Sequence, residues 1–124
     1  VAEANRQTFV IVQIESPEAL EHAEAIAAVD GVDILMLGPG DFSILSGCPG
    51  RMDAPCVMEA KRRIAAAAAA AGKQWGCPVG SIDQARELME MGARLVFYQA
   101  DIVILKAGLE QVQRDMSPLG FTFD

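Results

Sequence analysis

Residues 10–43 read VIVQIESPEALEHAEAIAAVDGVDILMLGPGDFS, and this stretch decides the fold class. Two apolar runs, 10–12 and 34–37, are separated by an amphipathic segment and a turn. Glu15 follows the first run and Asp41 follows the second. Apolar runs of this length, with an amphipathic segment between them, are typical of parallel strands joined by a helix. In that arrangement Glu15 and Asp41 emerge side by side at one edge of the sheet.

The same strand–helix pattern continues along the chain. We expect strands at 9–14, 32–37, 73–77 and 93–98. Helices should start after Ser16-Pro17, near Pro55, at the capping-box pattern Ser81-Ile82-Asp83-Gln84, and at 102 with Asp101 as its cap. Residues 38–55 are expected to form a long loop, which in a compact domain usually serves a functional site.

Alternating strands and helices predict an α/β fold with a parallel sheet and right-handed crossovers. A complete (β/α)₈ barrel takes about 250 residues. The 124 residues of this chain therefore suit a single region, 1–124, of four βα units, which would be the C-terminal half of a TIM barrel. The alternative is a small flavodoxin-like open sheet, which usually has about five strands.

Composition limits the function classes. The formal charge is −7, and no basic stripe that would bind nucleic acid or an anionic membrane is present. No apolar run approaches the roughly 18 residues of a membrane span, and no signal-peptide pattern opens the chain. Three cysteines without C-x-x-C spacing favour reduced thiols over a disulfide framework or a zinc site. We therefore expect a cytoplasmic protein with neither nucleic acid nor membrane as a partner.

The carboxylate pair is the strongest chemical signal. Two strand-end carboxylates, with water and substrate filling the remaining positions, suit a hard divalent cation such as Mg²⁺. Each residue also has a structural interpretation: Glu15 can favour the adjacent helix N-terminus, and Asp41 can form an Asx turn. A histidine pair for zinc is absent, because His22 is the only histidine and is expected mid-helix, at the surface or in packing.

Several neutral groups accompany this pair. The glycines of Gly38-Pro39-Gly40-Asp41 permit close approach of a ligand, and the N–H groups of Gly40, Asp41 and Phe42 could cradle a carboxylate or phosphate. Gln13 lies two residues before Glu15 and so shares its strand face. It could bind a substrate oxygen or fill a polar interior. Trp75 could line the same cavity, although core packing is favoured. Tyr98 and Gln99 could form a pocket wall or helix-cap contacts, and Lys61-Arg62-Arg63 is interpreted as a solvated helix face.

Taken together, VIVQIESPEAL, DGVDILMLGPGDFS, GKQWG and ADIVILKAG resemble the HpcH/HpaI family of class II, metal-dependent pyruvate aldolases over approximately residues 9–113. The G-P-G-D-F variant also resembles the branch that contains macrophomate synthase. The resemblance implies a TIM barrel in which Glu15 and Asp41 bind Mg²⁺, Mn²⁺ or Co²⁺. It further implies that Gln13 lies against the pyruvate moiety and that the amides of Gly40 and Asp41 bind the substrate carboxylate.

The implied activity is metal-dependent carbon–carbon bond cleavage or formation in 2-oxo acids such as pyruvate or oxaloacetate. The arginine, histidine and aspartate that the resemblance implies for catalysis belong to the first half of the barrel, so no catalytic residue is assigned here. We expect this half to need the N-terminal half, and the protein to form a homo-trimer or hexamer in which residues 102–115 reach a neighbouring subunit.

Three alternatives remain. One is a macrophomate-synthase-like enzyme that decarboxylates oxaloacetate and forms carbon–carbon bonds. Another is a citrate-lyase-β-like enzyme, which would need basic residues for the phosphates of coenzyme A. The third is a non-catalytic half-barrel that pairs with another chain as a structural subunit.

Overall fold

The computed structural model describes residues 2–123 and contains one parallel sheet of four strands in the order β1-β2-β3-β4. In the strand register, Gln13 of β1 lies opposite Met36 of β2, and Met36 lies opposite Gly76 of β3. Gly76 in turn pairs with Leu95 of β4. Bounds of the strands are Ile11–Ile14 for β1, Ile34–Leu37 for β2, Gln74–Val79 for β3 and Leu95–Tyr98 for β4.

Seven α-helices and a 3₁₀ turn accompany these strands in residues 2–123. The helices are α1 Ala2–Gln7, α2 Pro17–Glu21, α3 Ala23–Ala27, α4 Pro39–Leu45, α5 Pro55–Ala70, α6 Ile82–Glu90 and α7 Asp101–Met116. The 3₁₀ turn is Ser117–Leu119. None of the helices in this part of the chain is long and apolar enough to cross a membrane.

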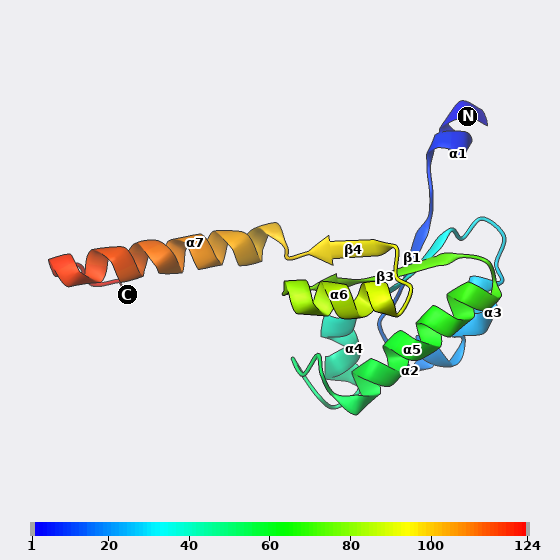
Figure 1. The fold of residues 1–124 in the computed structure, drawn as a ribbon, viewed down its shortest axis with the longest axis horizontal. Coiled ribbons are helices and arrows are strands. Elements are labelled where there is room, and N and C mark those ends of the chain that lie inside the picture. Colours follow the sequence, from blue (N-terminus) through cyan, green and yellow to red (C-terminus); the bar gives the residue numbers. More distant parts are fainter. Residues whose placement is uncertain (1, 124) are drawn as a thin grey trace.

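The strand order decides between the two architectures that the sequence left open. Each strand lies beside the next one in the chain, so the direction of winding never reverses. Right-handed crossovers that all run in one direction put their helices on one side of the sheet, as in a TIM barrel. A flavodoxin-like sheet reverses its order and covers both sides. Figure 1 shows α3, α5 and α6 on the same side of the sheet.

The two faces of the sheet consequently differ. The covered face, under the helices, carries side chains that are almost completely buried: Ile14, Leu35, Leu37, Trp75, Cys77 and Val79. The open face carries Gln13, Glu15, Met36, Gly38 and Pro78, and no helix of residues 2–123 packs over it. Within residues 2–123 the helices therefore cover only one face of the sheet.

The local signals for helix starts are confirmed at two positions. Ser16 Oγ accepts a hydrogen bond from Ala19 N at 3.1 Å, and Pro17 occupies the first turn of α2. Ser81 Oγ accepts from Gln84 N at 3.2 Å. The reciprocal bond of the capping box is shifted by one residue, because Gln84 Oε1 accepts from Gly80 N at 2.8 Å rather than from Ser81 N.

Three expectations about the helices and the loop between them were wrong. Residues 38–55 do not form one loop, because Gly38 caps and Pro39 begins the helix α4. A proline at the first helical position costs no hydrogen bond, so the residues interpreted as a turn can equally begin a helix. His22 is not mid-helix: it is exposed and separates α2 from α3. The cap of α7 is Ala100, while Asp101 is its first residue and accepts a hydrogen bond from Ile102 N.

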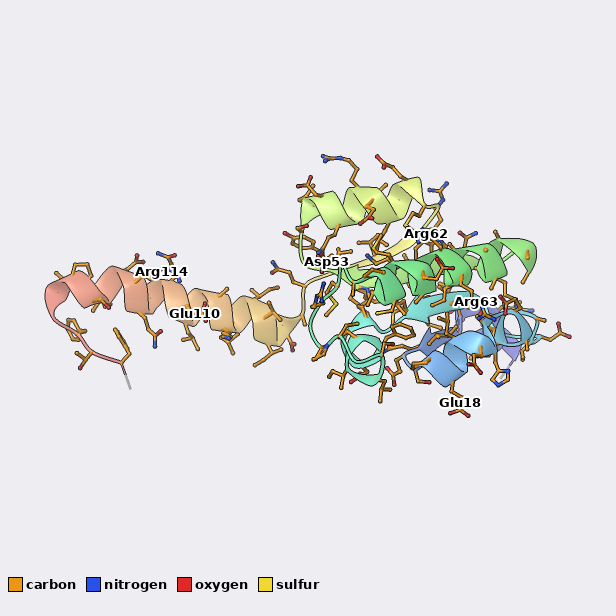
Figure 2. All side chains as sticks on the ribbon, turned by 90° about the horizontal axis from the view of Figure 1, so that it is seen from below. Glu18, Asp53, Arg62, Arg63, Glu110 and Arg114 are labelled. Carbon is orange, nitrogen blue, oxygen red and sulfur yellow. The ribbon has the colours of Figure 1, made fainter. Side chains whose placement is uncertain are left out.

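The last helix stands apart from the rest. α7 projects away from the sheet in Figure 1, and Figure 2 shows Glu110 and Arg114 on it, far from the side chains of the body. None of its residues is buried, although Ile102, Leu105, Leu109 and Val112 are apolar. This helix therefore adds nothing to the core formed by the described residues.

Candidate active site

The open face carries a compact polar cluster where β1 and β2 end. Gln13 Nε2 donates a 2.6 Å hydrogen bond to Glu15 Oε2. Gly38 lies against both residues: a Cβ on Gly38 would be 2.5 Å from Gln13 Nε2 and 2.8 Å from Glu15 Cβ. Because φ and ψ of Gly38 are −91° and 83°, its backbone is not in the left-handed region. The glycine is therefore required by space rather than by conformation.

Asp41 lies three residues further on, in the first turn of α4. Negative charge is favoured at this end of a helix. Phe42 N donates to Gly38 O at 3.0 Å, which is the first hydrogen bond of α4. The N–H of Phe42 is therefore occupied and cannot join the cradle expected from the sequence. The N–H groups of Gly40 and Asp41 precede that bond, in the turn where helix amides have no intrahelical acceptor.

Ser43 holds the start of α4 and the following loop together. Its buried hydroxyl donates to Gly40 O at 2.7 Å and accepts from Gly50 N at 3.0 Å. The thiols of Cys48 and Cys56 lie beyond this point, with their Sγ atoms 2.8 Å apart. These contacts fix the segment that leads from the polar cluster to α5.

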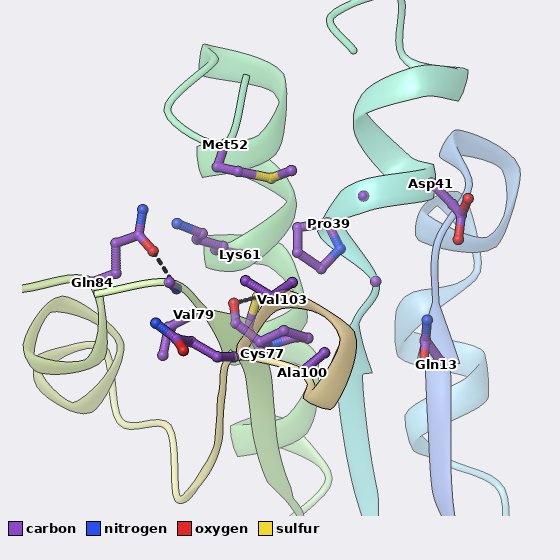
Figure 3. A pocket seen from close by; sticks show the side chains of 15 residues that line it. Gln13, Pro39, Asp41, Met52, Lys61, Cys77, Val79, Gln84, Ala100 and Val103 are labelled. Atoms are coloured by element: carbon purple, nitrogen blue, oxygen red, sulfur yellow. Dashed lines mark hydrogen bonds between the residues drawn. The ribbon is translucent and has the colours of Figure 1, made fainter. Parts of the chain in front are cut away.

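A pocket of about 530 Å³ opens at this edge of the sheet. Volumes of this size suit a small-molecule ligand. Figure 3 shows Gln13 and Asp41 at one side of the pocket and Lys61 and Gln84 at the other. The residues that line it are Gln13, Gly38, Pro39, Gly40, Asp41, Met52, Lys61, Cys77, Pro78, Val79, Gly80, Gln84, Gln99, Ala100 and Val103.

Lys61 is the pocket residue that the sequence interpretation missed. It had been assigned to a solvated helix face together with Arg62 and Arg63. In the structure Lys61 is only 6% exposed, whereas Arg62 is exposed and Arg63 binds Glu24 of α3 at 3.0 Å. The sequence spacing indicates this burial, because Lys61 follows Val57 by four residues and precedes Ile64 by three. All three residues therefore lie on the buried stripe of α5.

Cys77 forms part of the pocket wall on the covered face. Burial raises the pKa of its thiol to about 11, and the nearby Lys61 ammonium opposes that shift. The thiol is therefore protonated at neutral pH, and Cys77 serves as an apolar wall rather than as a nucleophile.

Three further residues named in the sequence analysis, Trp75, Tyr98 and Gln99, lie in different environments. Trp75 is 3% exposed and belongs to the core, as the packing interpretation expected. Tyr98 is half exposed and does not line the pocket described above. Gln99 does line it, and its φ of 62° is uncommon for a residue with a side chain. Gln99 N donates to Val79 O at 3.0 Å, which stabilises this turn.

The oxygen-rich donor set fits a hard divalent cation. The close approach of Gly38 leaves room for the Gln13 and Glu15 side chains, and the bond from Gln13 orients the Glu15 carboxylate. Residues 2–123 contain no group of three or more His, Cys, Asp or Glu side chains placed to hold an ion. A site built on Glu15 and Asp41 would therefore depend on water and substrate for its other positions, which is how Mg²⁺ is commonly bound.

A singly wound parallel sheet, with a pocket at the carboxyl ends of its strands, is the arrangement of TIM-barrel enzymes. The chain belongs to the HpcH/HpaI aldolase/citrate lyase family, whose model matches residues 1–105.

Individual relatives agree with this assignment. The hydroxypyruvate/pyruvate aldolase of Delftia acidovorans is 41% identical over 103 residues, which are 83% of this chain and 38% of that protein. An HpcH/HpaI aldolase/citrate lyase family protein from Burkholderia cenocepacia has 36% identity and a TM-score of 0.82 over 94% of this chain and 45% of its own. Macrophomate synthase has 30% identity and a TM-score of 0.75 over 96% and 43%. The chain thus spans less than half the length of these relatives.

Proposed function

We propose that this chain is the metal-binding half of a divalent-metal-dependent aldolase that cleaves or forms 2-oxo acids. The observation that carries the proposal is the cluster in which Gly38 makes room for the hydrogen-bonded Gln13 and Glu15 side chains, with Asp41 following on α4. Family membership supports the reaction class, because its relatives include a hydroxypyruvate/pyruvate aldolase.

In this proposal Glu15 and Asp41 hold Mg²⁺, Mn²⁺ or Co²⁺. A bound cation of this kind supplies positive charge that stabilises negative charge developing on a substrate oxygen. Gln13 fixes one Glu15 carboxylate oxygen through its 2.6 Å bond, so the carboxylate keeps one orientation. The amides of Gly40 and Asp41, at the positive end of α4, bind the carboxylate of the 2-oxo acid.

The working enzyme requires a second half of the barrel. β1 and β4 are the outer strands of the sheet, and each has only one strand neighbour in the described part of the chain. Edge strands of this kind must pair or be covered. A complementary set of four βα units would close the sheet, cover the open face and supply the groups that transfer protons.

We also propose that α7 packs on a neighbouring subunit of a homo-oligomer. Support comes from its projection away from the sheet and from its exposed apolar residues Ile102, Leu105, Leu109 and Val112. A helix with this apolar content is normally covered by another element.

Calorimetric titration of Mn²⁺ in the presence of oxalate, a stable analogue of a 2-oxo acid, tests the metal site. We expect Glu15→Gln and Asp41→Asn each to weaken Mn²⁺ binding by about 100-fold or more, because removal of a residue that only supports a ligand already costs 10–100-fold. Glu59→Gln is the matched control, since Glu59 is an exposed carboxylate paired with Arg62 on α5. Equal affinity in all three variants and the parent protein would disprove the site.

A further inference from the structure

Lys61 carries a buried positive charge that lacks an anionic partner among the described residues. Its side chain is 6% exposed, and no carboxylate in residues 2–123 lies within ion-pair distance of its ammonium. Its one hydrogen bond runs from Nζ to the sulfur of Met58 at 3.4 Å, and a thioether is a weak acceptor. A lysine ammonium can donate three hydrogen bonds, so its capacity is largely unused.

The position of this charge points to a ligand. Lys61 lines the pocket, and only two of the lining residues carry charged side chains, Lys61 and Asp41. Figure 3 shows them at opposite sides, with Lys61 between Met52 and Gln84. Burial of an ammonium without an anion is costly, and an anion entering the pocket would offset that cost. Gln84 adds a neutral polar group at the same side.

We propose that Lys61 is a specificity-determining residue that binds a second carboxylate at the far end of a dicarboxylic 2-oxo acid. The proposal rests on the proposed function, which assigns the 2-oxo carboxylate to the side of the pocket that holds Gln13, Gly40 and Asp41. A substrate with carboxylates at both ends then spans the pocket.

A carboxylate suits this side better than a phosphate group. A phosphate monoester carries nearly two negative charges at neutral pH, and sites for it combine several cations or backbone amides. The pocket offers one cation, Lys61, in a chain whose formal charge is −7. A single ammonium balances a single carboxylate.

The test compares two C5 acids that differ only in the distal group. Mn²⁺-loaded protein is titrated with 2-oxoglutarate, which has a distal carboxylate, and with 2-oxopentanoate, which has a methyl group there. We expect the parent protein to bind 2-oxoglutarate more tightly than 2-oxopentanoate. Lys61→Met should weaken the affinity for 2-oxoglutarate by about tenfold or more and leave the affinity for 2-oxopentanoate unchanged. Lys73→Met is the control, because Lys73 bonds Val29 O and does not line the pocket.

The outcomes separate the two proposals. Suppose that both acids bind in the presence of Mn²⁺, and that Lys61→Met leaves both affinities unchanged or changes them equally. The role of Lys61 is then overturned and the proposed function stands. If neither acid binds with or without Mn²⁺, both are overturned. If inorganic phosphate competes more strongly than malonate in the parent protein but not in Lys61→Met, a phosphate site replaces the carboxylate site.

Thermal unfolding without any 2-oxo acid gives an independent measurement. A lysine kept for ligand binding destabilises the empty pocket, so Lys61→Met should raise the unfolding midpoint. A lysine with a purely structural role would instead lower the midpoint when replaced. That second result would overturn the proposal even if the titrations could not be completed.

Discussion

The covered face of the sheet carries the core of this chain, whereas the open face carries the polar residues of the candidate site. On β2, Leu35 and Leu37 point into the helix layer and are completely buried, while Met36 and Gly38 between and after them belong to the open face. The first pair supplies core, and Gly38 supplies space for Gln13 and Glu15. Because side chains alternate along a strand, stability and chemistry are encoded at adjacent positions of the same short segment.

The difference has a physical reason. Helices reach only one side of a singly wound sheet, so apolar residues on that side are buried without help from another chain. The other side holds polar groups at the strand ends, where a ligand can enter. Substitutions on the two faces should therefore affect different measurements.

The largest expected effect is on the covered face. Leu35→Ala should lower the free energy of unfolding by about 3 kcal/mol, because it leaves a cavity under α5. Met36→Ala, one residue along and only half-buried, should cost less than about half of that. Urea unfolding followed by circular dichroism measures both. Equal losses would show that the faces are not different in the assembled protein.

The next effect is on the open face. Gly38→Ala puts a methyl group 2.5 Å from Gln13 Nε2 and 2.8 Å from Glu15 Cβ, so both side chains must move. Mn²⁺ affinity should fall by about tenfold or more, as when other groups that orient ligands are disturbed.

Gly108→Ala is the matched control for this substitution, because nothing lies within 4 Å of a Cβ at Gly108. If Gly38→Ala binds Mn²⁺ as tightly as the control, the close approach of Gly38 is irrelevant to the site.

The smallest effect concerns Cys77, where the covered face meets the pocket. Its pKa of about 11 means that only about one thiol in a thousand is ionised at pH 8. Iodoacetamide at pH 8 should therefore label the half-buried Cys56 well before Cys77, as read by peptide mass spectrometry.

The same shift in Cys77 has a consequence for stability. The unfolded thiol loses its proton near the ordinary value of 9.0, while the folded thiol keeps it to about 11. The contribution of this group to the free energy of unfolding is thus present below pH 9 and declines as the pH rises from 9 toward 11.

In the labelling experiment, modification of Cys77 in the folded protein as fast as Cys56 would contradict the burial of Cys77.

The four strands and the starts of α2 and α6 could be predicted because each had a local cause. Ser16 and Ser81 cap the first turns of α2 and α6, and short apolar runs mark the four strands. Glu15, Gln13 and Asp41 could be placed at one sheet edge because parallel strands end together. The fold class and the family assignment follow from these features.

The missed features depend on tertiary context. α4 is a seven-residue helix whose Gly-Pro-Gly start is equally suited to a turn, so only its packing settles the choice. Lys61 was grouped with two neighbouring arginines, although its spacing matches the buried stripe of α5. The expectation that residues 102–115 reach a neighbouring subunit came from the family resemblance, because an apolar pattern shows that a helix needs a partner without showing which one.

Gly38 offers a diagnostic for reading other sequences that share these two strands. Its φ of −91° would admit almost any amino acid, yet the Cβ of any of them would overlap Gln13 and Glu15. A protein with the same strands, helices and both carboxylates, but with a larger residue at this position, cannot arrange Gln13 and Glu15 in this way. The residue at position 38 therefore distinguishes proteins that share only the fold from proteins that also share the site.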